Sequence, residues 1–326
     1  MPALTLIDWA KRQGPDSKQA KIVELLNQTN EILDDMLFVE SNQATGHRTT
    51  VRTGLPSATW RMLNYGVPPS KSTTAQVTDT VGMLETYSEV DKELADLNGQ
   101  TAEFLLSESL AFLESMNQEM AETLIYGDTT VHPQRFTGLS ARFNSLAAKN
   151  GVNIIDAGGT GSNLTSIWLV VWGENTVHGL FPKGSKAGLQ QEHKGQVTLE
   201  DENGGKYEGY RTHFQWKNGL TVRDWRYVVR ITNIDISKLK KDPEAADSLD
   251  LPDLLIQAIE KIPNLAMGRP AIYCNQAIRS WMRRQIKNSK NVNISMQEVA
   301  GKKVVSFDEI PVRRVDSILT TESQVK

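Results

Sequence analysis

The chain contains TAEFLLSESLAFLESMNQEMAETLIY, residues 101 to 126, a stretch that reads as one long amphipathic helix. At 100° per residue its large apolar side chains fall in one sector and its glutamates fall on the opposite side, which is the pattern of a helix packed along one face. The predicted apolar sector comprises Ala102, Leu105, Leu106, Leu110, Phe112, Leu113, Met116, Met120 and Leu124. Such a helix spans about 39 Å, the width of a small domain, so we expect it to organise the rest of the fold.

The ends and the charge of this helix are also predictable. Asn98 or Thr101 can cap its start, because a short side-chain oxygen accepts from first-turn amides, and Gly127 can end it in a left-handed conformation. Residues 93 to 134 hold eight acids and no Lys or Arg. The helix must therefore rely on packing, or on cations from elsewhere in the chain or from another chain. Phe104 interrupts the acidic face and indicates a second contact surface.

Composition places the chain among folded proteins without covalent cross-links. Its 326 residues are 39% hydrophobic and 23% charged, and a net charge of −3 argues against a protein held to nucleic acid or membranes by basic excess. Cys274 is the only cysteine, so no intrachain disulfide can form, and its neighbours AIYCN predict a buried, inert thiol. The start carries no signal pattern and no apolar run reaches membrane-spanning length, so we expect a chain made in the cytosol.

The first third of the chain predicts an arm and a polar ribbon. Residues 18 to 40 carry apolar residues at helical spacing and predict a first helix. Residues 41 to 94 predict two Thr-rich strands joined by the turn-rich LNYGVPPSKS. These strands are polar on both faces, and an isolated two-stranded ribbon is only marginally stable. The ribbon must either fold back over its own domain or lie on a neighbouring copy, and the residues alone leave both open.

The second half predicts a mixed domain. SIWLVVWG is a candidate buried strand, and RTHFQWKNGLTVRDWRYVVRITN predicts two strands joined by a tight turn at 217 to 219. A helix is expected from Asp250 with Pro252 in its first turn, then strand AIYC, a helix capped by Asn275, and two closing strands in KKVVSFDEIPVRRVDSIL. Strands and helices do not alternate regularly, so the fold class is α+β.

No pattern in the sequence indicates catalysis, a cofactor or a metal. GGTGSN and FPKGSKAG lack the order of a phosphate loop, the five histidines are scattered, and no G-x-S-x-G elbow is present. Asp224 and Asp308 stand beside arginines, but surface ion pairs are far commoner than catalytic carboxylate pairs. Six tryptophans admit core packing or use as interface anchors: Trp60, Trp168, Trp172, Trp216, Trp225 and Trp281.

Two other functions fit parts of the sequence. A β-rich carbohydrate-binding surface protein would use exposed tryptophans as sugar platforms, and a hydrolase would lose turnover when Asp224 or Asp308 is replaced. Both leave the long acidic helix and the polar ribbon unexplained. We therefore expect that the chain is not an enzyme.

The order of parts resembles that of a known family. The stretches that carry the likeness are LPSATWRMLNYGV (55 to 67), YGDTTVHPQRFTGL (126 to 139), TSIWLVVWG with FPKGS, and FDEIPVRRVDSI (307 to 318). With them, the arm, the polar loop, the long helix and the mixed domain resemble the major capsid proteins of tailed double-stranded DNA bacteriophages with the HK97-like fold. The likeness is greatest to the capsid proteins of epsilon15-like short-tailed phages and covers nearly the whole chain.

The resemblance implies a division of the chain. Residues 1–40 would form an N-terminal arm and 41–97 an extended β E-loop. Residues 98–150 and 299–326 would form the peripheral (P) domain, including a spine helix over 98–127. Residues 151–298 would form the axial (A) domain with some P-domain strands.

The resemblance also implies a function and partners. Copies would self-assemble into hexamers and pentamers of an icosahedral head enclosing double-stranded DNA, which the wall contacts non-specifically. A separate scaffold protein and a portal would take part, with or without a cement protein. Assembly would occur in the cytoplasm of the bacterial host, and no membrane would be involved. The candidate intersubunit contacts are Trp60, Arg61, Lys71, Phe104, Glu114, Arg135, Arg313 and Arg314.

Overall fold

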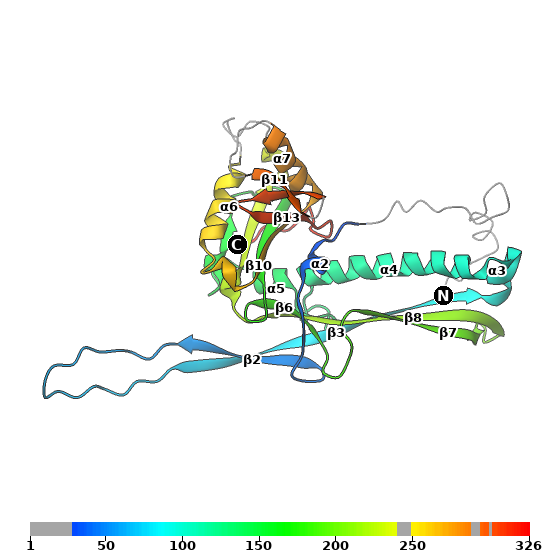
Figure 1. The fold of residues 1–326 in the computed structure, drawn as a ribbon, viewed down its shortest axis with the longest axis horizontal. Helices are drawn as coiled ribbons and strands as arrows, with labels where there is room; N and C mark the ends of the chain where they lie inside the picture. The colour runs from blue at the N-terminus through cyan, green and yellow to red at the C-terminus, as the bar shows by residue number, and fades with distance from the viewer. Residues whose placement is uncertain (1–27, 240–248, 288–293, 300–301) are drawn as a thin grey trace.

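The computed structural model describes residues 28–239, 249–287, 294–299 and 302–326 (Figure 1). The helices are α2 (Ile32–Asp35), α3 (Lys92–Asp96), α4 (Thr101–Tyr126), α5 (Leu139–Arg142), α6 (Leu251–Glu260) and α7 (Gln276–Lys287). The strands are β1 (Phe38–Glu40), β2 (Gly46–Gly54), β3 (Thr73–Asp91), β4 (Ile154–Asp156), β5 (Leu164–Trp172), β6 (Val177–Phe181), β7 (Leu189–Glu200), β8 (Lys206–Val222), β9 (Val228–Asp235), β10 (Arg269–Cys274), β11 (Ile294–Val299), β12 (Lys302–Phe307) and β13 (Ile310–Arg314). Helices and strands are mixed without regular alternation, so the predicted α+β class is confirmed.

The strands join in one twisted sheet whose centre is covered on both faces. Its main path runs β11-β12-β13-β10-β5-β6-β8-β3-β2. Every residue of β5 is buried. Ile167, Leu169 and Val171 belong to the core with α6 and α7, whereas Trp168 and Trp172 belong to the core with the C-terminal half of α4. Strand β5 is apolar throughout because a helical layer lies against each of its faces.

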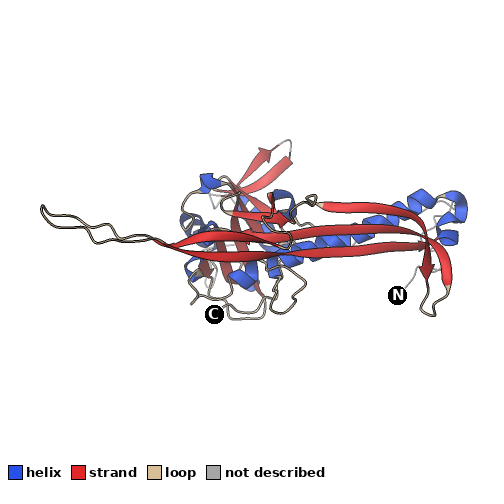
Figure 2. Cartoon of the chain, turned by 90° about the horizontal axis from the view of Figure 1, so that it is seen from below, coloured by secondary structure: helices blue, strands red, loops and turns tan. Residues whose placement is uncertain are grey.

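The long helix α4 lies along an extension of this sheet. Strands β3, β7 and β8 run beside it (Figure 2), and the rings of Phe112 and Phe214 stack with centroids 6.2 Å apart. Near its start Phe104 packs with Val90 and Ala95 in a small separate cluster. The helix thus connects a large core at its C-terminal end to a narrow extension at its N-terminal end, where it lies along β3, β7 and β8 with only a small apolar cluster.

A polar limb, residues 46–80, projects from the body in the direction opposite to this extension (Figures 1 and 2). It consists of β2 paired antiparallel with residues 73–80 of β3 and of the connecting loop 55–72, which contains no helix or strand. From Val81 onward the same strand β3 pairs with β8 in the body. One continuous strand therefore carries the limb, and the predicted pair of strands with a long loop is confirmed.

Most of the other predicted elements are confirmed. Helix α4 has the predicted bounds, and α6 begins after Asp250, whose carboxylate accepts from the amide of Asp253 at 3.2 Å. Asn275 caps α7 by accepting from the amide of Ile278 at 3.0 Å. Strand β10, the closing strands β12 and β13, and the burial of Cys274 also match.

Both predicted caps of α4 are wrong, although its bounds match. Gln100 precedes the helix without a side-chain cap, and the hydroxyl of Thr101 donates instead to Asp96 at 2.7 Å. Gly127 has φ −54°, which is not left-handed. A glycine is needed there for another reason, because a Cβ would lie 2.3 Å from the carbonyl oxygen of Phe136 where the chain returns.

The predicted apolar sector of α4 holds only toward its C-terminal end. Met116, Met120 and Leu124 are buried, but Leu106 and Leu110 are 63% and 50% exposed. The N-terminal half meets a narrow sheet extension rather than a core, so less of its surface can be covered.

Two other predictions are corrected by tertiary pairing. The expected turn at 217–219 is absent, and β8 runs straight through it, because Gly219 lies inside the sheet where a Cβ would be 2.6 Å from the carbonyl oxygen of Thr80. The chain bends instead at Trp225–Tyr227. Of the helix expected over 18–40, residues 18–27 lie outside the described part, and the rest forms only α2 and then β1, which pairs with β6.

Candidate intersubunit surfaces

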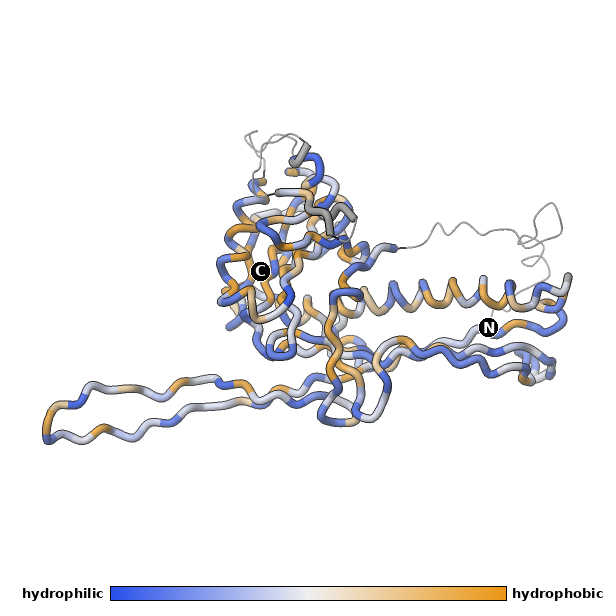
Figure 3. The backbone as a smooth tube through the Cα atoms, viewed as in Figure 1, coloured by the Kyte–Doolittle hydropathy of each residue, from blue (hydrophilic) through white to orange (hydrophobic). Residues whose placement is uncertain are grey.

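The tip of the limb, residues 55–72, exposes an unusual amount of apolar side chain. Trp60 is 103% exposed, and Leu63 and Leu55 are 84% and 80% exposed. Met62, Tyr65 and Val67 are exposed as well, and Figure 3 shows hydrophobic segments interrupting the polar limb. Arg61 and Lys71 on the same loop are exposed too. Exposed apolar side chains gathered on one loop in this way mark an interaction site.

A buried ion pair holds the limb at its root, where β2 and β3 leave the body. Arg142 on α5 donates to the carboxylate of Asp79 at 2.7 Å and to the carbonyl oxygen of Leu220 on β8 at 3.0 Å. Asp79 is 4% exposed, so this pair is shielded from water. The guanidinium thereby joins the limb, the body sheet and α5 in one rigid connection.

Two buried histidines lie beside this pair. The rings of His47 on β2 and His178 on β6 meet edge to face, with centroids 5.8 Å apart. His47 Nδ1 accepts from the Asn42 amide at 3.3 Å, and neither Nε2 has a partner among the described residues. Burial lowers the pKa of both imidazoles, and the nearby charge of Arg223 lowers each pKa further. The root of the limb is therefore built for neutral histidines.

The acidic helix finds cations and donors within its own chain. Arg135, the first basic residue after the acidic stretch, pairs with Glu119 at 2.7 Å and with Glu122 at 3.7 Å. Glu114 accepts from the amide of Gln28 at 2.8 Å and from the side chain of Gln118 at 2.7 Å. Part of the charge that the sequence leaves uncompensated is thus matched inside the subunit.

Arg313 and Arg314 hold the N-terminal arm to strand β13. Arg313 pairs with Asp35 at 3.2 Å, and the amide of Arg314 donates to Glu31 at 2.8 Å. The Arg314 side chain bonds Asp316 at 2.7 Å. Burial raises the pKa of Asp35, with the charge of Arg313 acting in the opposite direction. These arginines fix the arm where it crosses the body.

A pocket opens between β3 and the C-terminal half of α4. Its volume is about 190 Å³. Met120 and Phe136, which are buried, form its floor, while Met83 stands at its mouth with 68% exposure. The Arg135–Glu119 ion pair lies on its rim. The remaining lining residues are Gly82, Leu84, Thr123 and Gln134.

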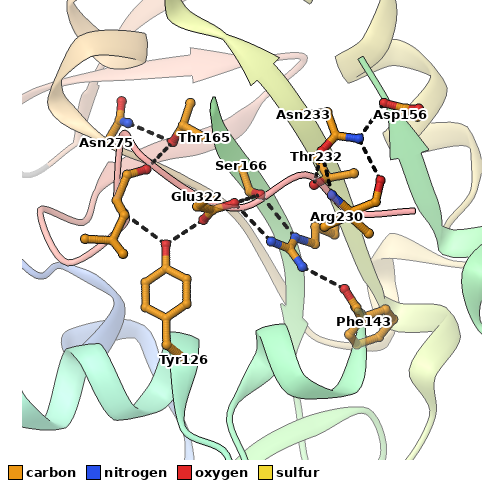
Figure 4. A network of polar contacts seen from close by, with 12 residues as sticks. Tyr126, Phe143, Asp156, Thr165, Ser166, Arg230, Thr232, Asn233, Asn275 and Glu322 are labelled. Atoms are coloured by element: carbon orange, nitrogen blue, oxygen red, sulfur yellow. Dashed lines mark hydrogen bonds and ion pairs between the residues drawn. The ribbon is translucent and has the colours of Figure 1, made fainter. Parts of the chain in front are cut away.

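A buried polar network anchors the C-terminal segment at the C-terminal end of α4 (Figure 4). Arg230 on β9 pairs with Glu322 at 3.0 Å, and their side chains are 3% and 5% exposed. Ser166 on β5 and Tyr126 at the end of α4 both donate to the same carboxylate. Burial, together with the Glu322 charge, raises the pKa of the Tyr126 phenol, which keeps it protonated and donating. Sequence reasoning missed this network because its members lie far apart along the chain.

Among the described residues no group suggests a catalytic or metal site. No cluster of three His, Cys, Asp or Glu side chains in these segments could hold a metal ion. Asp224 forms an ion pair with Arg226 at 2.6 Å, and Asp308 lies in the tight turn between β12 and β13 with φ 47°. No described helix is long and apolar enough to cross a membrane.

The structure thus separates the predicted contact residues into two groups. Trp60, Arg61 and Lys71 lie together on the limb tip. Arg135, Glu114, Arg313 and Arg314 contact groups of their own chain, and Phe104 is buried with 3% exposure. Of the tryptophans, Trp168, Trp172 and Trp281 are in the core, so for them the core-packing prediction is confirmed.

Comparison with known proteins gives a family and an extensive structural likeness. The sequence model of the family described as Major capsid protein GP7 matches residues 14–326. The solved structure of bacteriophage Epsilon15 is 39% identical, with a TM-score of 0.76, and the match covers 100% of this chain and 98% of that one.

Other solved structures are more distant. The capsid of bacteriophage JBD30 is 10% identical over 90% of this chain and 92% of that one, with a TM-score of 0.49. The SrpI encapsulin complex of Synechococcus elongatus is 12% identical over 71% of this chain and 97% of that one, with a TM-score of 0.47. Likenesses this distant support no conclusion about the present chain. No curated protein sequence matches it.

Proposed function

Because this chain belongs to the major capsid protein GP7 family, we propose that the limb of each copy completes its packing on an adjacent copy of the shell. The chain is a structural protein of an HK97-like phage capsid, and it is not an enzyme. Its copies assemble into an icosahedral shell. The proposal concerns which parts of the surface make that assembly.

The observation that carries the proposal is the exposed tip of the limb. Six large apolar side chains there are between 56% and 103% exposed. Full burial of one such side chain contributes about 1.5 to 3 kcal/mol, so covering all six would contribute on the order of 10 kcal/mol. A solitary subunit forgoes this energy, because its limb points away from its own core (Figure 3).

We propose a matching assignment of domains. Residues 1–40 are the N-terminal arm, 41–97 the E-loop, and 98–150 with 299–326 the P domain, whose spine is α4. Residues 151–298 form the A domain, except that β7 and β8 extend the sheet beneath the spine together with β3.

The assembly proposed for these parts has several partners. Copies form hexamers and pentamers in the cytoplasm of a bacterial host, with a separate scaffold protein, a portal and a cement protein. The packaged double-stranded DNA touches the wall non-specifically, because a chain of net charge −3 does not bind phosphates strongly. For the chain itself we propose no cofactor.

We also propose roles for the predicted contact residues. Trp60, Arg61 and Lys71 are presented by the limb to the adjacent copy. The other predicted contact residues border or support the surface of the adjacent copy that receives the limb: Phe104, Glu114, Arg135, Arg313 and Arg314. Exposed ion pairs contribute only about 0 to 1 kcal/mol each, so repetition over many copies provides the stability of the shell.

The experiment replaces residues 55–72 by an Asn-Gly turn, which keeps the whole β2–β3 ladder. We expect a soluble protomer with unchanged circular dichroism and no closed shells by negative-stain microscopy. A matched control exchanges only the polar residues Ser70 and Ser72 for Ala, and it should assemble normally. Normal shells from the shortened limb would refute its intersubunit role.

A further inference from the structure

The pocket at the C-terminal half of α4 and the limb tip are complementary surfaces of the same chain. We propose that Trp60 of one copy inserts into this pocket of a second copy, with Arg61 placed over its acidic rim. This inference rests on the proposed function of the limb and names the residues that receive it.

Size and chemistry support the insertion of an indole. An apolar cavity of about 150 Å³ accommodates benzene, and this pocket measures about 190 Å³. The thioethers of Met83 and Met120 offer polarizable contacts to an aromatic ring. Gly82 carries no side chain that would narrow the opening, and Glu119 and Gln134 provide oxygen acceptors for the indole N–H.

Charge supports the placement of the neighbouring arginine. Glu119 and Glu122 have side-chain exposures of 37% and 55%, and Arg135 is the cation paired with both. Two carboxylates facing one guanidinium leave one negative charge at the rim. Arg61 comes directly after Trp60, so docking of the indole brings a positive charge to this rim.

The guest must come from another copy. The pocket is lined by β3 beyond the limb root, whereas Trp60 lies past the far end of the paired ribbon. The nine residues of β2 alone separate the two by roughly 30 Å. A tip of one copy in the pocket of the next is a heterologous contact, the type that closes into rings.

Disulfide trapping tests this contact with the indole kept in place. The variant combines Arg61→Cys with Glu122→Cys. The native Cys274 is buried, and burial raises its pKa to about 12, so it gives no background. We expect mild oxidation of assembled particles to give a ladder of oligomers larger than dimers on a non-reducing gel.

Matched variants show whether Trp60 directs the contact. Adding Trp60→Ala should reduce the cross-linked fraction about tenfold or more, the loss expected for an interface hot spot. Adding Ser72→Ala, at an exposed polar residue of the same loop, should leave the cross-linked fraction within about twofold, which corresponds to about 0.4 kcal/mol. Equal losses from both additions would overturn the role of Trp60.

A second pair of cysteines distinguishes failure of this inference from failure of the proposed function. Arg61→Cys with Leu106→Cys places the partner thiol on the exposed N-terminal half of α4. A ladder from this pair and none from the Glu122→Cys pair would overturn the insertion of Trp60 into the pocket. It would still support the proposed contact of the limb with a neighbouring copy. Where the cysteines prevent assembly, Arg61→Glu should lower the yield of particles and Glu122→Arg should restore it. A failure of restoration would also overturn the inference.

Discussion

Replacing Glu322 by Leu should sharply weaken the attachment of the C-terminal segment at the end of α4. The carboxylate accepts from Arg230 at 3.0 Å, from Ser166 and from Tyr126, and both charged side chains are at most 5% exposed. The substitution therefore leaves a buried guanidinium without its counter-charge.

The expected loss depends on the contacts that Arg230 retains. Its Nη1 still donates to the carbonyl oxygen of Phe143 at 2.8 Å, and its guanidinium lies 4.9 Å from the ring of Trp168. These contacts do not neutralise the charge. Removing one partner of a buried ion pair costs about 3 to 5 kcal/mol, and we expect Glu322→Leu to lower the free energy of unfolding by this amount.

The assay is urea denaturation of the unassembled subunit, monitored by tryptophan fluorescence, because Trp168 lies against the network. The companion variant combines Glu322→Leu with Arg230→Met and removes both charges. It leaves the carbonyl oxygen of Phe143 without its donor, so it should lie within about 1 to 3 kcal/mol of the wild type. The double variant should thus be more stable than the single one.

Two results would refute this reasoning. If the free energy of unfolding of Glu322→Leu lies within about 1 kcal/mol of the wild-type value, water solvates the Arg230 charge as it does at an exposed site. A double variant less stable than Glu322→Leu would mean that the arginine stabilises the fold through packing and hydrogen bonds rather than through its pair.

Further predictions concern the root of the limb, the thiol and the turn after α4. The pKa values of His47 and His178 are lowered in the folded state, so below about pH 6.5 the unfolded chain binds protons more readily than the folded one. The free energy of unfolding should therefore be highest above about pH 6.5 and fall below it, by at most about 1.4 kcal/mol per pH unit for each group. Urea titrations between about pH 7.5 and 4.5 should show this slope, which His178→Gln should reduce and a change at exposed His132 should not. Cys274 should resist alkylation at about pH 8 in the folded subunit and react on denaturation, so fast labelling of native protein would contradict its burial. Gly127→Ala should destabilise by about 1 to 3 kcal/mol or more in thermal melts, because its Cβ would meet backbone 2.3 Å away, and an unchanged melting temperature would contradict this.

Local patterns predicted most of the elements. The bounds of α4, the caps Asp250 and Asn275, and the burial of β5 and Cys274 are explained by periodicity, capping chemistry and continuous apolar runs. Predictions failed where two distant backbones approach each other. Asn218 and Gly219 look like a turn locally, but Gly219 is a strand residue because Thr80 comes within contact distance of its Cα.

The candidate surfaces were predictable only in part. The exposed tip with Trp60 and Arg61 could be found because its apolar residues lie in a polar, turn-rich segment with no periodicity to bury them. The pocket could not, since Met83, Met120 and Phe136 come from three segments and each reads as an ordinary core residue. The pairing of Arg135 with Glu119 was likewise hidden, because it depends on the return of the chain after Gly127.

The sequence by itself determined the mixed fold class, the long acidic helix and the polar limb that its own residues cannot cover, because periodicity and composition act over short distances along the chain. Tertiary structure alone decided the direction of the limb, the ion pair of Arg142 with Asp79 at its root, and the network of Arg230 with Glu322. These depend on segments brought together from 63 and 92 residues apart, and the burial that makes such charge pairs strong exists only after the chain has folded.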